Sequence, residues 1–318
     1  MRTITAPAIP PALSRYDEPT RQPLRVALVQ HRWHADPAAL RAELADGIAA
    51  AAQAGAAAVF LPELTLRQYP AFVRAGDNPG ADAEDLHTGP TATFAAEMAR
   101  EHDIFVHASL YQQAPATDGS SPDGLGLNTA ILVSPQGEIV AHTHKLHIPI
   151  SPGYYEDTYF RAGPADDPYP VHRPEGLPAA FGFPTCWDEW FAEVTRSYSI
   201  AGAEILVYPT AIGSEPDFPD FDTQPQWQQV IVGNAIANAT FMIVPNRHGD
   251  EGAITFYGSS FICDPYGRIL VAAPRDESVT LVADLDLDQR RDWLALFPFL
   301  ATRRPDTYTS LTAPIVVP

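Results

Sequence analysis

The chain has 318 residues, of which 46% are hydrophobic, 10% aromatic and 19% charged, and this composition excludes an intrinsically disordered chain. Asp and Glu number 39 against 20 Lys and Arg, a formal net charge of -19, so most of the surface would repel phosphates and we expect no nucleic-acid partner. The chain has two cysteines, no basic segment leading into an apolar one at its start, and no apolar run of about 20 residues. We therefore expect a cytoplasmic protein that does not enter the membrane.

The first 23 residues contain five prolines and few large apolar side chains. We expect them to form an N-terminal extension, residues 1–23, that is flexible or wraps over the surface, followed by one folded domain over residues 24–318. The domain begins with an apolar run, residues 24–30, which predicts a buried strand. Asp36 followed by Pro37 then predicts the start of a helix.

Apolar residues continue at helical spacing until Gly55, which ends that helix. The next apolar run, residues 57–61, predicts a second buried strand that runs directly into Pro62 and Glu63. Further along the chain the patterns predict one helix and three strands: helix 88–102 and strands 104–110, 128–133 and 138–144. Lys145 stands where the last of these strands ends.

Residues 148–178 hold seven prolines and predict a long irregular segment, which inside a compact domain is usually functional. A strand then approaches Cys186, and a helix is expected from Trp187 to Tyr198. The remaining expected elements are strand 204–210, helix 227–239, strand 241–246, a hairpin over 254–273 and strand 279–287. Alternating strands and helices mixed with hairpins predict an α/β sandwich with mixed sheets.

The two cysteines lie in different settings. Cys186 is expected at a strand-to-helix corner, where backbone N–H groups and the positive end of the helix would lower the pKa of a thiol and present it as a nucleophile. A lone cysteine is otherwise most often buried and inert. Cys263, inside a hairpin strand without such a corner, matches the inert interpretation better.

Glu63 and Lys145 are the other candidates for chemistry. Glu63 follows a buried strand, where burial can raise the pKa of a carboxyl enough for general-base catalysis, although it could instead cap a helix. Lys145 is the only lysine among 20 basic residues, and a compact ammonium suits a developing oxyanion better than a guanidinium does. The alternative is a surface lysine that extends its charge into water.

Two further groups surround these candidates. His142, His144 and His147 alternate around Lys145 and could share a face, but no third acidic or cysteine ligand stands at a matching spacing, so we predict no metal site. Asp188 and Glu189 follow the nucleophile candidate and could either complement a helix N-terminus or attract a cationic substrate.

Taken together, "FLPEL" with Glu63, "HKLHIP" with Lys145 and "TCWDEW" with Cys186 resemble the carbon-nitrogen hydrolase (nitrilase) superfamily, and the likeness extends from Leu24 to Tyr308. The resemblance implies a four-layer αββα sandwich that needs no metal or organic cofactor. The resemblance also implies the catalytic roles: Cys186 as nucleophile, Glu63 as general base and then acid, and Lys145 with the Trp187 N–H as oxyanion donors. Glu156, in "GYYEDTYF", matches the family's second glutamate, which would orient Lys145 and the substrate.

Longer segments such as "GAEILVYPTAIGSEP" and "FYGSSFICDPYG" are most similar to the N-carbamoylputrescine amidase subgroup. The expected activity is hydrolysis of an N-carbamoyl amine to the amine, carbon dioxide and ammonia, with Trp187, Asp188 and Glu189 contacting the substrate. Acidic residues beside the nucleophile favour a cationic amine. That subgroup usually has Gln in place of Glu189 and an acid in place of Gln112, which indicates a retuned amine pocket.

Other functions stay open at this point. A β-ureidopropionase, an aliphatic amidase or a nitrilase would use the same catalytic residues, and a chain with this fold could also be a binding module without activity. Members of the family tend to dimerise through helices that include the one after the nucleophile, so the resemblance implies a homodimer or a larger homo-oligomer.

Overall fold

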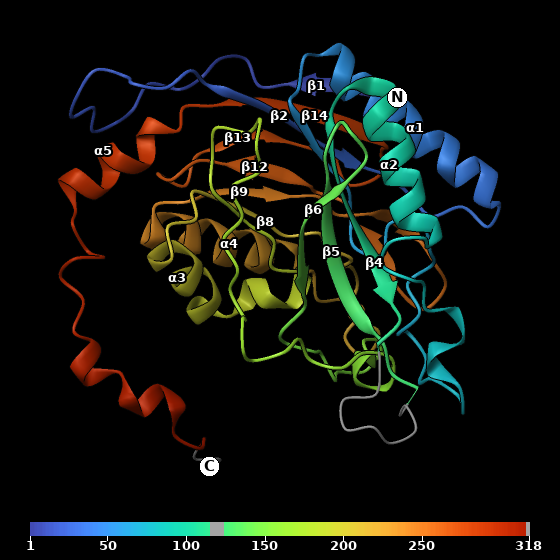
Figure 1. Cartoon of the computed structure of the whole chain (residues 1–318). Coiled ribbons are helices and arrows are strands. Elements are labelled where there is room, and N and C mark those ends of the chain that lie inside the picture. The colour runs from blue at the N-terminus through green and yellow to red at the C-terminus, as the bar shows by residue number, and fades with distance from the viewer. Residues whose placement is uncertain (115–123, 316–318) are drawn as a thin grey trace.

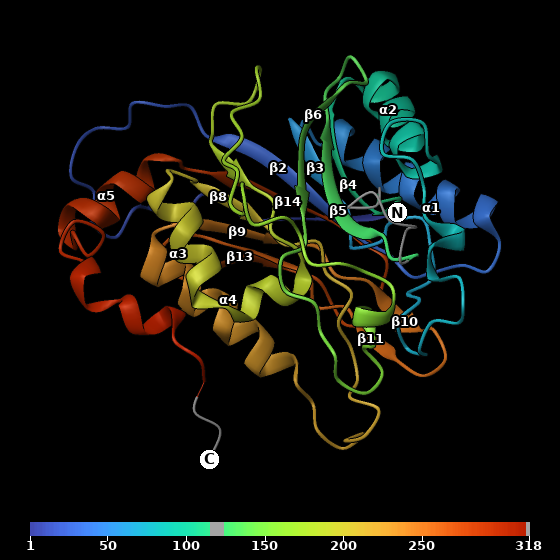
Figure 2. The same ribbon diagram turned by 60° about the horizontal axis from the view of Figure 1, so that its bottom comes forward.

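Two β-sheets pack face to face at the centre of the protein, and helices cover the outer face of each (Figures 1 and 2). The computed structural model describes residues 1–114 and 124–315, so the last three residues of the expected domain lie outside it. Helices α1 and α2 cover one sheet, and α3 and α4 cover the other. This is the predicted four-layer αββα sandwich with mixed sheets.

The larger sheet has seven strands in the order β1-β14-β2-β3-β4-β5-β6, with these bounds: β1 Arg2–Thr5, β14 Val279–Leu285, β2 Leu24–Gln30, β3 Ala58–Phe60, β4 Phe105–Gln112, β5 Leu127–Val133 and β6 Ile139–His144. The smaller sheet has five strands, β13 Ile269–Ala272, β12 Phe261–Cys263, β9 Phe241–Val244, β8 Ile205–Val207 and β7 Phe181–Gly182, and a separate hairpin joins β10 His248–Asp250 to β11 Thr255–Tyr257. The helices are α1 Pro37–Gln53, α2 Pro90–His102, α3 Ala192–Ile200, α4 Gln224–Asn238 and α5 Asp288–Leu296.

Strand direction follows from the connections. Helices α1 and α2 link β2, β3 and β4, which run parallel, and α3 and α4 link β7, β8 and β9, which also run parallel, because a parallel pair needs a crossover. Strands β4, β5 and β6 follow one another along the chain and form an antiparallel meander on the larger sheet. The carboxyl ends of the parallel strands are where open α/β sheets place their ligand sites.

Alternate residues of a strand serve different layers, as the pleat requires. In β2, Val26 and Leu28 face the core between the two sheets, whereas Ala27 and Val29 face the core under α1 and α2. The strand is therefore apolar on both faces, which explains why the sequence reads as a continuous apolar run. A third core lies between the smaller sheet and the helices α3 and α4.

Three local differences from the sequence predictions stand out. The expected extension is not wholly outside the core, because Arg2–Thr5 form β1, which pairs in parallel with β14 at the edge of the larger sheet. The single helix expected after Cys186 is divided into a 3₁₀ turn, Cys186–Trp190, and α3. Helix α5 was not expected, because its sequence "DQRRDWLAL" is mostly polar and shows no apolar stripe. None of the helices in residues 1–114 and 124–315 is long and apolar enough to cross a bilayer.

Candidate active site

Four predicted side chains meet between the two sheets, at the carboxyl ends of the parallel strands. Glu63 follows β3, Lys145 follows β6, Cys186 follows β7, and Glu156 lies in a short 3₁₀ turn of the irregular segment. At most 6% of any of them is exposed. The structure therefore brings together the residues that the sequence motifs indicated, from four separate regions of the chain.

Lys145 is the centre of this group. Its Nζ donates to Glu63 Oε1 at 2.9 Å and to Glu156 Oε1 and Oε2 at 2.9 and 2.7 Å. Asn128 Nδ2 also donates to Glu63 Oε1, at 2.7 Å, while Glu63 Oε2 is buried without a hydrogen-bond partner among the described residues. One oxygen of Glu63 is thus fixed by two donors, and the other is free to accept a proton.

The second carboxyl, Glu156, is held from two sides, since Tyr69 donates its hydroxyl to Glu156 Oε1 at 2.8 Å. Burial raises the pKa of Glu156 to about 7, and the Lys145 ammonium opposes that shift. Burial alone would lower the pKa of Lys145, but the charges of Glu156 and Glu63 outweigh it and hold the pKa well above its ordinary value. Lys145 is therefore a permanent cation beside the nucleophile.

Cys186 is the nucleophile candidate, and its backbone has an unusual conformation. Its φ is +39°, in the left-handed region that costs a non-glycine residue free energy and recurs at functional sites. Its N–H donates to the carbonyl of Pro209 at 3.0 Å. Burial raises the pKa of the Cys186 thiol well above its usual value, with a further contribution from Glu63. The resting residue is a neutral thiol, so it needs a base to become a nucleophile.

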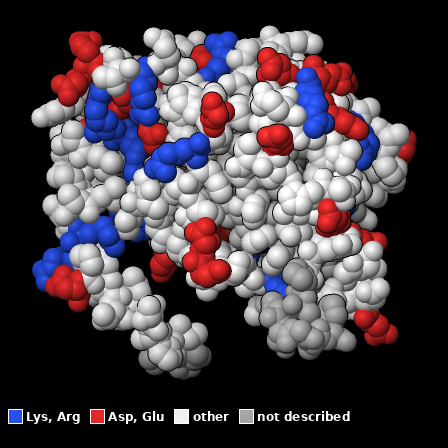
Figure 3. Space-filling model, viewed as in Figure 1, with Lys and Arg blue, Asp and Glu red and all other residues white. Residues whose placement is uncertain are grey.

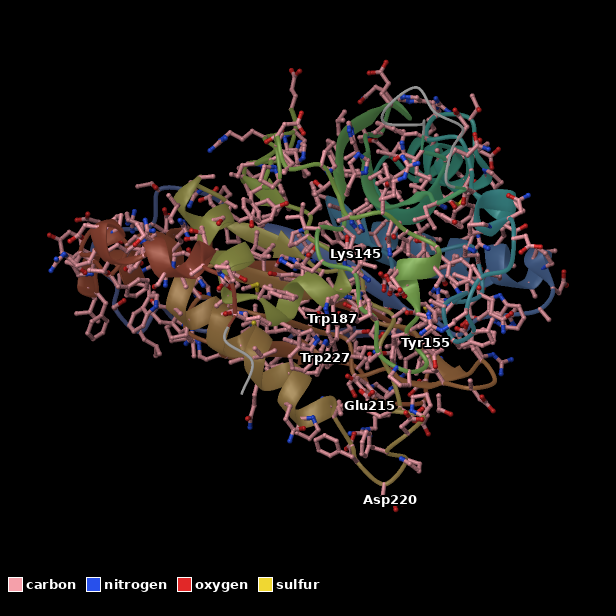
Figure 4. The ribbon with its side chains drawn as sticks, turned by 90° about the horizontal axis from the view of Figure 1, so that it is seen from below. Lys145, Tyr155, Trp187, Glu215, Asp220 and Trp227 are labelled. Carbon is pink, nitrogen blue, oxygen red and sulfur yellow. The ribbon has the colours of Figure 1, made fainter. Side chains whose placement is uncertain are left out.

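A cavity of about 290 Å³ opens in front of Cys186, a volume near the lower end of the range for small-molecule sites. Apart from Glu156 and Glu215, its walls are apolar or uncharged: Pro149, Ser151, Tyr154, Cys186, Trp187, Trp190, Ala211, Ile212, Phe221, Thr223 and Gln226. Figure 4 shows Lys145, Trp187 and Glu215 in sequence from the interior toward the loop that carries Asp220. Glu215 therefore lies nearer the outside than Lys145 does.

The prediction that Asp188 and Glu189 contact the substrate is not supported by their positions, because neither lines this cavity. Asp188 is buried and accepts from the backbone N–H groups of Thr185 and His147 and from the His147 ring. Its carboxylate thus ties the nucleophile turn to the segment after Lys145. Trp187, in contrast, does line the cavity.

Glu189 faces the interior behind the cavity wall. Its Oε1 accepts from Trp227 Nε1 at 2.7 Å, and no residue of the described chain bonds its Oε2. Burial raises the pKa of Glu189 well above its ordinary value and so favours its protonated form. A protonated acid has no charge with which to attract a cation.

Three residues of the site were not found from the sequence: Asn128, Tyr69 and Glu215. Asn128 had a detectable signal, since it is a polar side chain at the start of an otherwise apolar strand. Tyr69 and Glu215 had none, because their roles depend on how loops fold back over the cavity. Glu215 lies within a segment that resembles the family, yet nothing in that segment marks the residue as a ligand.

Of the three histidines around Lys145, the fold places His147 apart from His142 and His144. His147 stacks on Phe191 with ring centroids 3.7 Å apart, whereas the His142 and His144 rings lie 5.5 Å from each other. Within residues 1–114 and 124–315 no group of three or more His, Cys, Asp or Glu side chains is placed to hold a metal ion.

An αββα sandwich with a buried cysteine, a glutamate and a lysine at its strand ends defines a class, the thiol-dependent amidohydrolases. The family model for carbon-nitrogen hydrolases matches residues 25–295, and the chain belongs to that family. It is an enzyme that hydrolyses carbon-nitrogen bonds.

Individual relatives narrow the comparison. The chain is 34% identical over 301 residues to citrullinase of Francisella tularensis, covering 91% of this chain and 98% of the relative. It is 33% identical over 273 residues to N-carbamoylputrescine amidase of Solanum tuberosum, covering 83% and 86%. The fold is similar to that of a carbon-nitrogen hydrolase of Helicobacter pylori, with a TM-score of 0.79, 28% identity and coverage of 92% and 100%.

Proposed function

We propose that this enzyme hydrolyses the ureido group of an N-carbamoyl amine with a cationic tail, such as N-carbamoylputrescine, to the amine, carbon dioxide and ammonia. Both kinds of relative named above take their names from a ureido substrate, which supports this reacting group. The cationic tail is supported by the residues that line the cavity, above all by Glu215.

Glu215 is the acid that an amine tail would meet. It lines the cavity beside apolar and aromatic walls, is half buried and accepts from Thr223 Oγ1 at 3.4 Å. Burial raises its pKa above the ordinary value, which means that the carboxylate gains from a nearby cation. Among the described residues that line the cavity, none is Lys or Arg. The site therefore complements an ammonium better than a carboxylate.

The first half of the reaction forms a thioester. Cys186 Sγ attacks the ureido carbon while Glu63 Oε2, the oxygen without a partner, takes the thiol proton. The negative charge moves to the carbonyl oxygen, where Lys145 Nζ and the Trp187 N–H stabilise it. The bond between the ureido carbon and the terminal nitrogen then breaks, and Glu63 returns the proton to that nitrogen. Ammonia departs, and the N-substituted carbamoyl group remains bound to Cys186.

The second half regenerates the enzyme. A water molecule attacks the thioester carbon and gives its proton to Glu63, the carbon-sulfur bond breaks, and Cys186 recovers a proton. The released carbamic acid decomposes to carbon dioxide and the free amine. Glu156 and Tyr69 hold Lys145 in place throughout, because a cation shared by two carboxylates needs a fixed geometry to serve the oxyanion.

Ammonia release from N-carbamoylputrescine, L-citrulline and N-carbamoyl-β-alanine tests the proposal. We expect kcat/KM to be highest for the first, since the other two carry a carboxylate into a cavity that offers it no cation. Cys186→Ala should abolish release. Glu215→Gln should raise KM for N-carbamoylputrescine about tenfold or more with little change in kcat, because it removes binding energy far from the reacting carbon.

Two results would contradict the proposal. Faster hydrolysis of L-citrulline than of N-carbamoylputrescine would assign the cavity to an amino acid. Release of ammonia from simple aliphatic amides alone would show that the ureido nitrogen is not recognised.

A further inference from the structure

Arg247 is a buried arginine next to the site that takes no direct part in the proposed chemistry. It is fully buried, and its guanidinium donates to the turn that carries Glu63 and to one acid, Glu251. Nη2 donates to the carbonyl oxygens of Glu63 and Leu64 at 2.7 and 3.0 Å, and Nη1 donates to that of Arg67 at 3.2 Å. Nη1 also pairs with Glu251 Oε1 at 2.8 Å.

Glu251 extends this contact to the second carboxyl of the site. Its Oε2 accepts from the Tyr69 N–H at 3.0 Å, and the Tyr69 hydroxyl donates to Glu156 Oε1 at 2.8 Å. The ion pair of Arg247 and Glu251 therefore binds both ends of the segment from Glu63 to Tyr69. One end supplies the base and the other holds Glu156.

The turn depends on such a partner. Leu64, directly after the base, has a φ of +49°, a conformation that persists only where the surroundings impose it. Three carbonyl oxygens converge on the guanidinium; that of Leu64 also accepts from the Arg67 N–H, but leaving those of Glu63 and Arg67 without the guanidinium donors would be costly. A planar guanidinium with several diverging donors satisfies all three, whereas the single ammonium of a lysine does not reach them in the same geometry.

We propose that Arg247 and Glu251 form a positioning pair, which sets the direction of the Glu63 carboxylate toward Cys186 and, through Tyr69, that of Glu156. The inference rests on the catalytic roles proposed above for Glu63 and Glu156. Neither Arg247 nor Glu251 touches the cavity. Their effect should therefore appear in the rate of the chemical step and not in substrate binding.

The experiment compares Arg247→Lys with Arg290→Lys. Arg290 is a matched control, because its guanidinium also donates to three carbonyl oxygens, those of Ser199, Asn238 and Ala239, at 2.8–2.9 Å. It lies in α5 at the far end of the smaller sheet from the site, as Figure 1 shows. Both substitutions remove a guanidinium from three backbone carbonyl oxygens, but only the carbonyls bound by Arg247 belong to the turn that contains Glu63.

We expect Arg247→Lys to lower kcat about 100-fold with KM unchanged within about threefold, since a displacement of about 1 Å at a reacting group costs that much. Arg290→Lys should lower Tm without changing kcat. In Arg247→Ala, added guanidinium ion below denaturing concentration should restore part of kcat, while methylammonium should not. If Arg247→Lys fails to fold, Glu251→Gln provides the same test with a smaller volume change.

An unchanged kcat in folded Arg247→Lys, with only a lower Tm as in the control, would overturn the inference. Glu63→Gln is measured alongside to separate this failure from failure of the proposed function. An inactive Glu63→Gln with a fully active Arg247→Lys would refute the positioning pair alone. An active Glu63→Gln would refute the proposed mechanism itself.

Discussion

Two networks of charged side chains hold this protein together, and they differ in their access to water. At the site, Lys145, Glu63 and Glu156 are buried, and their pairs measure 2.7–2.9 Å. At the seam between the N-terminal extension and α5, Arg15 and Arg21 are each 31% exposed and pair with the buried Asp292 and the partly exposed Glu204. Figure 3 shows basic and acidic side chains gathered over this seam, at the upper left.

The difference explains why only one network can carry chemistry. Burial raises the pKa of Glu156 to about 7, and the charges of Glu156 and Glu63 hold the pKa of Lys145 well above its ordinary value although burial opposes them, so the protonation of Glu156 depends closely on the geometry of this group. At the seam, Asp288 keeps a lowered pKa despite burial because the N–H groups of Thr20 and Arg21 bond it. Asp288 therefore stays ionised near neutral pH, and its hydrogen bonds only hold the N-terminal extension against α5.

The largest expected effect is that of Lys145→Arg. The guanidinium keeps the charge but needs more room than a fully buried site provides and cannot place a single donor on the oxyanion. We expect kcat for ammonia release to fall about 1,000-fold, since removing one oxyanion donor costs about 10²–10³. Arg25→Lys, at the exposed pair with Asp284, should leave kcat unchanged. A Lys145→Arg enzyme within tenfold of the parent would contradict the role given to the ammonium.

A second prediction concerns a buried titratable group away from the cavity, His107. Its ring lies between those of Phe60 and Phe183, and burial lowers its pKa to about 3. The unfolded chain binds this proton below about pH 6.5 and the folded chain only below about pH 3, so stability falls as pH drops between these values. From pH 7 to pH 5 the loss from this residue should be about 2 kcal/mol, at 1.36 kcal/mol per pH unit.

His107→Phe should remove that loss, since a phenyl ring matches its neighbours and takes up no proton. Urea unfolding at pH 7 and pH 5 measures the difference, and His31, whose pKa is also lowered to about 3 by burial, should keep part of the slope in the variant. Equal pH dependence in both proteins would show that folding does not lower the pKa of His107 and that its burial has no such effect.

A third prediction uses Glu189, the buried acid that lies beside the site without joining its network. Because burial favours the protonated form of Glu189 and the residue does not line the cavity, Glu189→Gln should change kcat by less than about threefold, whereas Glu63→Gln should be inactive. The folded pKa lies above the unfolded one, so wild-type stability decreases as pH rises above about 4.5. The Gln variant lacks this dependence and should gain stability over wild type from pH 5 to pH 8. A large loss of kcat in Glu189→Gln would instead show that Glu189 is ionised in the working enzyme.

The contrast between the buried active-site network and the partly exposed seam also explains what the sequence could predict. Glu63 directly follows an apolar run, Cys186 follows a short strand and Lys145 follows the last strand of the predicted meander, and a polar residue at the end of a strand is visible without coordinates. The prediction that Asp188 contacts the substrate was wrong, because the direction of its side chain depends on the backbone conformation of the turn. The positive φ of Cys186 and the 3₁₀ turn after it direct the carboxylate back to the segment of His147 instead of into the cavity.

Contacts between distant segments were beyond reach for a related reason. Nothing near Glu215 in the sequence shows that its loop returns to the cavity, and nothing in residues 1–23 shows that they meet α5. Local patterns record which side chains need burial. They do not record which exposed polar side chains find each other, because many pairings of surface charges have similar free energies.

The smallest expected effect belongs to the seam. Arg15 pairs with Asp292 at 2.7 Å and with Asp286 at shorter range, while part of its side chain stays in water. Asp292 is buried but keeps its pair with Arg291 in the variant, so Arg15→Ala should lower the free energy of unfolding by less than about 1 kcal/mol, and high salt should shrink that difference because it screens the exposed guanidinium. Urea unfolding of both proteins at low and high ionic strength measures it, with kcat expected to stay constant. A loss as large as that from a buried pair, about 3–5 kcal/mol, would mean that the seam excludes water as the active site does, and that the extension is part of the core.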